Sequence, residues 1–280
     1  MVHQAPQEAG YRTSRWTLRD LRSACSWLRL TTESGLWRLL QRLDIVKKQG
    51  RLVLHSPDPN YRAKLDYVGQ CWQEMLDNPD EIVIVYLDEF SYYRQPTLAA
   101  AYEARGHQQW RANLSQRSNI RCRGLGAVNA YTGQVHYTQS HKITLKVQIA
   151  FYQVITASYP HAKTIYVIQD NWPNHAHPSV LAHLEPQRTT FLPASASNRS
   201  SVEWTTTPDQ AWPIQLVFLP TYAPWTNPIE KLWRLLRQDV LHLHRFSDRW
   251  EDLKQRVLDY MAQFAHGSTP LLHAIGLLPV

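Results

Sequence analysis

Three short apolar runs divide the main body of the chain, and each has the pattern of a strand buried on both faces. They are IVIVYL at 82–87, KTIYVIQ at 163–169 and IQLVFLP at 214–220. Near-continuous runs of apolar and β-branched residues are typical of central strands that helices cover on both sides. A fourth segment, 120–140, predicts a hairpin, because two strand-like runs flank a turn at 131–133.

Apolar residues at helical spacing predict helices between and after these strands. The spacing covers 61–77, 144–158, 177–184, 228–236 and 247–265. Strands that alternate with helices in this way indicate an α/β fold. One segment breaks the alternation. It is 185–213, which is rich in Ser, Thr and Pro and is interpreted as a surface insertion.

The N-terminal part predicts a small all-α segment. After a polar stretch at 1–15, interpreted as disordered, the apolar spacing predicts two short helices, 16–28 and 33–45, joined by a tight turn. Arginines border the second helix and a basic run follows it, which fits a helix-turn-helix. Plain helix packing beside a solvated basic face is the alternative interpretation. The candidate DNA-binding residues are Arg38, Arg42, Lys47, Lys48 and Arg51.

The distribution of charge favours DNA binding over plain packing. The net charge is +7, and residues 1–66 hold twelve Lys or Arg against six Asp or Glu, so the rest of the chain is nearly neutral. A basic segment on a near-neutral body is typical of an arm that binds nucleic acid. The three cysteines lie far apart without CxxC spacing, which argues against a disulfide framework or a thiolate zinc site. Without a membrane-length apolar run or a signal-like N-terminus, we expect a soluble cytoplasmic protein.

The patterns divide the chain into four predicted parts. They are a disordered N-terminus (1–15), a helix-turn-helix segment (16–56), a linker with a helix (57–80) and a catalytic domain (81–280) that contains the insertion.

Three acidic residues lie where the predicted strands end. Asp88 and Asp170 follow the first two apolar runs directly, and Glu230 lies in the turn and helix after the third. Open α/β sheets place functional residues at the carboxyl ends of their strands, so we expect the three carboxylates to converge. Mg²⁺ prefers oxygen ligands, and two such ions about 4 Å apart support phosphodiester cleavage or transfer.

The two aspartates also have a purely structural interpretation. Asp88 could be a strand-end residue, and Glu89 competes with it for a place in the site. Neighbours in a strand point to opposite faces, so only one of the two is expected to enter the site. Asp170 and Asn171, which precede Trp-Pro, could form an Asx turn.

Glu230 has a structural alternative of its own. Asn227 is a good helix N-cap, Pro228 suits the first helical position, and Glu230 stands three residues after the cap. This is the spacing of a capping box, in which the glutamate binds backbone N–H groups. A glutamate fully used in this way would not be free to bind metal.

Three blocks of the sequence resemble the signatures of the DDE transposases of the mariner superfamily, specifically its bacterial insertion-sequence branch. They are VYLDEF (85–90), VIQDNWPNH (167–175) and FLPTYAPWTNPIEKLW (218–233), and the hairpin GLGAVNAYTGQV (124–135) is similar as well. The blocks occur in the family's order, and the resemblance extends over roughly residues 30–265.

The resemblance implies a ribonuclease-H-like catalytic core, which is a mixed sheet with helices on both sides. Asp88, Asp170 and Glu230 would be the catalytic triad and would bind two Mg²⁺ ions, for which Mn²⁺ can substitute. Asn171 and Asn227 would support these acids by orienting ligands or contacting DNA.

The resemblance also implies an activity and partners. The protein would bind the terminal inverted repeats of an insertion sequence, cleave the DNA there and join the 3′-OH end to target DNA at a TA site. It would work as at least a homodimer on paired double-stranded ends.

The chain departs from the family pattern in two places. Asp170 and Glu230 are 60 positions apart, wider than usual, and the segment 185–213 accounts for the excess. Only one helix-turn-helix fits before residue 66, where the family generally has two, so we expect a shortened form or a second-frame product. Two other functions stay open. One is a ribonuclease-H-like nuclease or resolvase without strand transfer, and the other is a transposase-derived DNA-binding protein with an inactive core.

Overall fold

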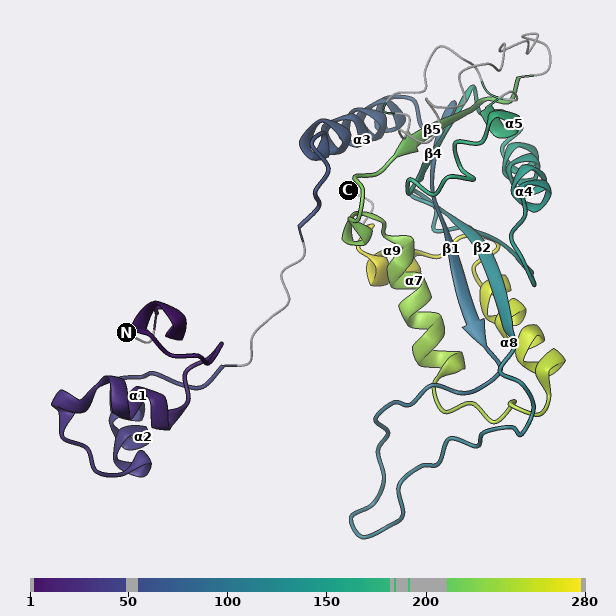
Figure 1. Cartoon of the computed structure of the whole chain (residues 1–280). Coiled ribbons are helices and arrows are strands. Elements are labelled where there is room, and N and C mark those ends of the chain that lie inside the picture. The colour runs from purple at the N-terminus through teal and green to yellow at the C-terminus, as the bar shows by residue number, and fades with distance from the viewer. Residues whose placement is uncertain (1–2, 49–54, 182–183, 185–190, 192–210, 278–280) are drawn as a thin grey trace. The chain divides into compact units, whose positions relative to one another are not determined.

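The structure is a computed structural model that describes residues 3–48, 55–181, 184, 191 and 211–277 (Figure 1). The chain divides into two compact units, Met1–Leu54 and His55–Val280. Arg51 and most of the predicted insertion 185–213 lie outside the described residues. In the described part, no helix is both long enough and apolar enough to cross a membrane.

The second unit is built on a mixed five-stranded sheet with the strand order β3-β2-β1-β4-β5 (Figure 1). β1 is parallel to β4 and β4 to β5, while β2 runs antiparallel to both β1 and β3. The three predicted apolar strands are therefore neighbours at one side of the sheet, and the predicted hairpin supplies the other two. The strands are β1 (Ile82–Tyr93), β2 (Arg121–Asn129), β3 (Val135–Ser140), β4 (Thr164–Gln169) and β5 (Ile214–Phe218).

β1 extends further than its apolar run predicts. Its parallel pairing with β4 stops at Tyr86 and Ile168, but its antiparallel pairing with β2 continues to Tyr93 and Arg121. Asp88 therefore lies inside β1, and the prediction that it follows the end of the strand is wrong. It still lies just beyond the point where the parallel pairing ends.

Helices cover both faces of the sheet (Figure 1). One face packs against α3, α7, α8 and α9 in a core that includes Phe90 and Trp233, and the other packs against α4 and α5 in a core that includes Leu87 and Tyr152. This is the α/β architecture, a mixed sheet with flanking helices, that the sequence and its resemblance predict. The helices of this unit are α3 (Tyr61–Asp77), α4 (Leu145–Ser158), α5 (Pro178–Leu181), α7 (Ile229–Leu236), α8 (Trp250–Ala262) and α9 (Thr269–Ile275).

Shorter elements complete the second unit. The 3₁₀ turn η4 (Pro224–Thr226) leads into α7, and the π-helical turn η5 (Arg237–Leu241) extends it. α3 has the predicted bounds, and α4 starts after Thr144, whose side chain accepts the N–H of Val147. The predicted helix 177–184 is described as a helix only over Pro178–Leu181.

The first unit contains the two predicted helices. Thr17 and Thr32 cap them, because their side chains accept the N–H groups of Asp20 and Gly35. Residues 3–15, predicted to be disordered, include a 3₁₀ turn, and the indole of Trp16 donates a hydrogen bond to the backbone oxygen of Gln4, 2.9 Å away. The elements are η1 (Pro6–Ala9), α1 (Leu18–Ala24), η2 (Ser26–Leu28) and α2 (Glu33–Arg42).

Candidate metal-binding active site

The three predicted acids lie around one cavity at the end of the parallel strands. Asp88 comes from β1, Asp170 follows β4 directly, and Glu230 is the second residue of α7. All three line a cavity of about 470 Å³, together with Asn171 and Asn227. Residues from positions 88 to 230 are thus brought together, because β4 pairs with β1 and β5 pairs with β4 in parallel, and the loops that follow β4 and β5 meet at this edge.

The electrostatics of the cavity fit a bound cation. Burial raises the pKa of Asp88 well above its usual range, and the nearby charges of Glu230 and Glu89 raise it further. Burial also raises the pKa of Glu230, with Arg237 acting in the opposite direction. Two neighbouring carboxyl groups with raised pKa values resist ionisation, and a positive charge between them would stabilise their ionised forms. Carboxylate oxygens are also the ligands that Mg²⁺ prefers. The donor set therefore fits the divalent metal that the resemblance implies.

Trp233 orients the carboxylate of Asp88. Its indole N–H donates a hydrogen bond to Oδ2 of Asp88 at 2.9 Å, and its ring stacks on Phe90 with centroids 5.4 Å apart. The ring lies against Gly126, which pairs with Asp88 across β1 and β2, and a Cβ at that position would overlap the ring. Trp233 belongs to the core on this face of the sheet. It is buried, but it also contacts the candidate site.

The capping-box interpretation of Glu230 is wrong. Asn227 does not cap the helix with its side chain. Its Nδ2 instead donates to the backbone oxygen of Leu87 at 3.1 Å, which ties the start of α7 to β1 beside Asp88. Pro228 occupies the cap position, and no side chain caps α7. The carboxylate of Glu230 is therefore not used as a cap and faces the cavity that it lines.

A buried ion pair joins Asp58, before α3, to Lys64, within α3, and both side chains also bind backbone groups of the turn after β5. Nζ of Lys64 lies 2.9 Å from Oδ2 of Asp58, and the two side chains are only 6% and 5% exposed. Asp58 also accepts the backbone N–H groups of Thr221 and Asn60. Burial alone would raise the pKa of Asp58, but the hydrogen bonds from Lys64 and the two backbone groups outweigh it and lower that pKa to about 2.

Lys64 and Asn171 connect the loop after β4, which carries Asp170, with the loop after β5, which leads to α7 and Glu230. The ammonium of Lys64 donates to the backbone oxygen of Leu219 at 3.3 Å and approaches Oδ1 of Asn171 at 3.5 Å. Nδ2 of Asn171 donates to the same backbone oxygen at 2.6 Å. Asn171 was predicted to support the acids, and its position joins the loop after β4 to the loop after β5.

Asp170 takes part in the predicted Asx turn and also contacts a histidine. Its Oδ1 accepts the N–H of Trp172 at 3.0 Å and lies 3.0 Å from Nδ1 of His175. Burial alone would raise the pKa of Asp170, but the hydrogen bond and charge of His175 outweigh it and lower that pKa. The structural and the functional interpretations of Asp170 therefore coexist.

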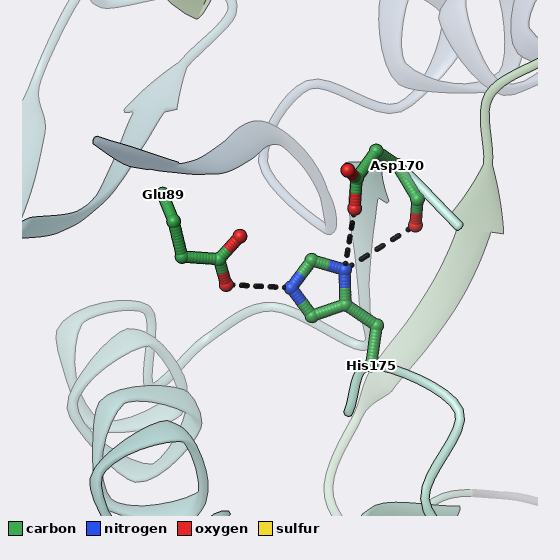
Figure 2. A group of neighbouring side chains, drawn as sticks. All are labelled: Glu89, Asp170 and His175. Carbon is green, nitrogen blue, oxygen red and sulfur yellow. Dashed lines mark hydrogen bonds and ion pairs between the residues drawn. The ribbon is translucent and has the colours of Figure 1, made fainter. Parts of the chain in front are cut away.

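Glu89 reaches the same histidine from the opposite side (Figure 2). Its Oε1 lies 2.8 Å from Nε2 of His175, a side chain with no exposed surface. Because both neighbours of the ring are carboxylates, which accept, both ring nitrogens donate. Burial alone would lower the pKa of His175, but Glu89 and Asp170 outweigh it and raise that pKa well above its usual range.

Glu89, Asp170 and His175 have ligand atoms within 4.8 Å of one another, close enough to hold a metal ion among the residues that the structure describes. The ring uses its two nitrogens for two different carboxylates, however, so a single ion cannot replace both contacts. We therefore interpret the group as a hydrogen-bonded chain that ends at Asp170. As expected, Asp88 and Glu89 face opposite sides of the sheet, since their neighbours belong to the two different cores.

The candidate DNA-binding residues belong to the first unit. Arg38, Arg42, Lys47 and Lys48 are all exposed, and Arg51 lies outside the described residues. Sequence reasoning missed His175, Lys64 and Trp233 as parts of the site. His175 stands within the second signature block and could have been noticed there, whereas Lys64 is distant in sequence and carries no motif.

Comparison with known proteins defines the class. The family model of the DDE superfamily endonucleases matches residues 83–254, which is more than half of the chain. The chain belongs to this family. The matched region contains all three candidate acids.

Among known proteins, the chain is similar to the "Insertion element IS630 uncharacterized 39 kDa protein" of Shigella sonnei. The two are 23% identical over 258 residues, which is 91% of this chain and 66% of the relative, so the chain spans slightly less than two thirds of the relative's length.

Solved structures of Mos1 transposase have a similar fold. The paired-end complex with left transposon end has a TM-score of 0.59 at 14% identity and covers 99% of this chain and 76% of its own. The mariner paired-end complex with Mn has a TM-score of 0.60 at 15% identity, with 98% and 74% covered.

Proposed function

We propose that the chain is a transposase of the DDE type and that Asp88, Asp170 and Glu230 are its catalytic residues. The observation that carries this proposal is the convergence of three acids, from three distant segments, on one cavity. The names of the similar proteins, an insertion-element protein and Mos1 transposase with transposon-end DNA, support it.

The substrates are double-stranded DNA ends and a target duplex. The protein binds the terminal inverted repeats of an insertion sequence, cleaves them and joins the 3′-OH end to target DNA at a TA site, acting as a homodimer in the cytoplasm beside the nucleoid. Residues 16–56 form the DNA-binding part, 57–80 the linker and 81–280 the catalytic domain. Arg38, Arg42, Lys47, Lys48 and Arg51 contact phosphates, because Lys and Arg that neutralise phosphates supply a large share of the affinity for DNA.

Asp88, Asp170 and Glu230 hold two Mg²⁺ ions, for which Mn²⁺ can substitute. When bound, such ions would supply the positive charge that activates a water for cleavage or the 3′-hydroxyl for joining and that stabilises the leaving oxygen. The chain's own residues prepare the site. The indole N–H of Trp233 fixes one oxygen of Asp88, and Asn227 holds the start of α7 against β1, so that Glu230 is presented to the cavity.

The cavity also has apolar walls. Trp172, Tyr222 and several prolines line it beside the acids. Apolar walls limit the number of water molecules around the carboxylates and strengthen electrostatic interactions inside the cavity.

A strand-transfer assay tests the proposal. The chain is incubated with Mg²⁺, a labelled duplex that carries the ends of its own insertion element, and a TA-containing plasmid. We expect the labelled 3′ end to become joined to the plasmid. Cleavage without joining would favour a ribonuclease-H-like nuclease, and binding without cleavage would favour an inactive DNA-binding protein.

A further inference from the structure

His175 lies between two acids that belong to different parts of the sheet. Glu89 extends from β1 on the face that α4 and α5 cover, and Asp170 follows β4 (Figure 2). The imidazole connects them, with 2.8 Å from Nε2 to Glu89 and 3.0 Å from Nδ1 to Asp170. Nδ1 also lies 3.3 Å from the backbone oxygen of Asp170.

The ring has little freedom to move. Its side chain has no exposed surface, and its ring and that of Trp172 meet in a T-shaped arrangement with centroids 5.5 Å apart. The backbone N–H of His175 donates to the backbone oxygen of Trp172 at 2.9 Å, which fixes the turn after Asp170. A fixed ring held at both nitrogens is suited to orienting a neighbouring ligand, as histidine–carboxylate pairs do around metals.

The contacts to Asp170 occupy only one of its carboxylate oxygens. Oδ1 accepts both the N–H of Trp172 and the Nδ1–H of His175. Among the described residues, Oδ2 has no hydrogen-bond partner, although Asp170 lines the same cavity as Asp88 and Glu230. One oxygen is thus used to fix the carboxylate, and the other is available as a ligand.

We propose that His175, held in place by Glu89, is a positioning residue that fixes the carboxylate of Asp170 for metal binding. This inference rests on the proposed function, because it concerns the same site. It assigns a role to Glu89 as well. Glu89 does not line the cavity that Asp88 lines, but it supports the site from the other face of the sheet through the imidazole of His175.

Two substitutions of His175 separate positioning from mere packing. In His175→Asn, the amide nitrogen can take the place of Nδ1 and still donate to Asp170, but it cannot reach Glu89. In His175→Gln, the longer side chain places its amide nitrogen where Nε2 was, near Glu89, and leaves Asp170 without its donor. Both variants lose the ring and its charge, so a packing role predicts equal effects.

The first readout is binding of Mn²⁺ to the protein without DNA, measured by electron paramagnetic resonance. We expect His175→Gln to weaken binding roughly 10- to 100-fold, the usual effect of losing such a partner, and His175→Asn to stay much closer to wild type. His136→Gln is the matched control. His136 is a partly buried histidine on the edge strand β3, hydrogen-bonded to Tyr159, and its replacement should leave Mn²⁺ binding unchanged.

The second readout needs no metal. Urea unfolding of His175→Gln, Asp170→Asn and the double variant forms a double-mutant cycle, and the charged contact predicts a coupling of roughly fivefold or more in the unfolding equilibrium constant.

If wild type binds Mn²⁺ and His175→Gln binds it equally well, or if His175→Asn and His175→Gln weaken Mn²⁺ binding alike, the inference is overturned and the proposed function stands. An additive cycle overturns it too. A coupled cycle in a protein that binds no Mn²⁺ supports the positioning contact but contradicts the proposed metal site.

Discussion

Replacing Lys64 with methionine tests how the loops of the candidate site are held. Methionine keeps most of the volume of the lysine side chain and removes its charge. In wild type the ammonium lies 2.9 Å from Asp58 and donates to the backbone oxygen of Leu219. The substitution leaves the carboxylate of Asp58 buried without its counter-ion, and it frees the loop after β5 from α3.

The expected cost follows from the burial of the pair. Removing one partner of a buried ion pair costs about 3–5 kcal/mol, because the remaining charge is uncompensated. Both side chains here are at most 6% exposed, but Asp58 keeps the N–H groups of Thr221 and Asn60 as donors. We therefore expect Lys64→Met to lower the free energy of unfolding by about 3 kcal/mol, the lower end of this range.

Urea unfolding followed by tryptophan fluorescence measures this cost. Lys163→Met is the matched control. Lys163 also forms an ion pair, 2.6 Å from Glu81, but it is 72% exposed, so its loss should cost less than about 1 kcal/mol. The double variant Asp58→Asn with Lys64→Met should cost less than the sum of the two single changes, since neither charge is then left alone.

Two results would refute this reasoning. One is a Lys64→Met variant that is no less stable than Lys163→Met. The other is a strictly additive double variant. Either result would mean that the ion pair between Asp58, before α3, and Lys64, within α3, does not stabilise the fold.

Three further predictions concern the same unit. Gly126→Ala should cost about 1–3 kcal/mol in urea unfolding, because the added Cβ overlaps the ring of Trp233. Trp233→Phe keeps a ring but removes the N–H that binds Asp88, so single-turnover DNA cleavage should fall roughly tenfold or more while DNA binding is unchanged. Asp58 has its pKa lowered to about 2, so its stabilisation, about 2 kcal/mol, is complete above pH ~4 and is lost as the pH falls through ~2. The difference in unfolding free energy between wild type and Asp58→Asn, measured across this range, should therefore shrink to nothing as the pH falls. An unchanged difference at low pH, or an unaffected Gly126→Ala or Trp233→Phe variant, would contradict the corresponding contact.

Local pattern was sufficient to predict most of the second unit. Buried strands have a distinctive apolar run, and the three runs proved to be neighbouring strands with α3 and α4 near their predicted bounds. The end of β1 was misplaced because its last residues pair only with β2, and such a long-range partner leaves no local signal.

The acids of the site were predictable, whereas the residues that hold them were not. Asp88, Asp170 and Glu230 stand at strand ends or within recognisable blocks, so their convergence could be expected. The partners of these acids come from distant segments. Asn227 has good capping chemistry, but the backbone oxygen of Leu87 on β1 competes for its side chain, and only the tertiary structure shows which partner wins. The contact between Glu89 and His175 crosses 86 positions and has no signal in local spacing.

Cleavage by wild type and by Glu230→Gln tests the central claim most directly. The substrate is a labelled duplex that carries the element's terminal repeat, with Mg²⁺ present, and binding of the duplex is measured in parallel. Glutamine keeps the size of the side chain and an acceptor oxygen but removes the negative charge that a metal ligand needs. We predict that wild type cuts at the repeat end, and that Glu230→Gln binds the duplex with wild-type affinity but does not cut it. Equal cutting by the two proteins would contradict the assignment of Glu230 as a catalytic metal ligand, and with it the proposed triad.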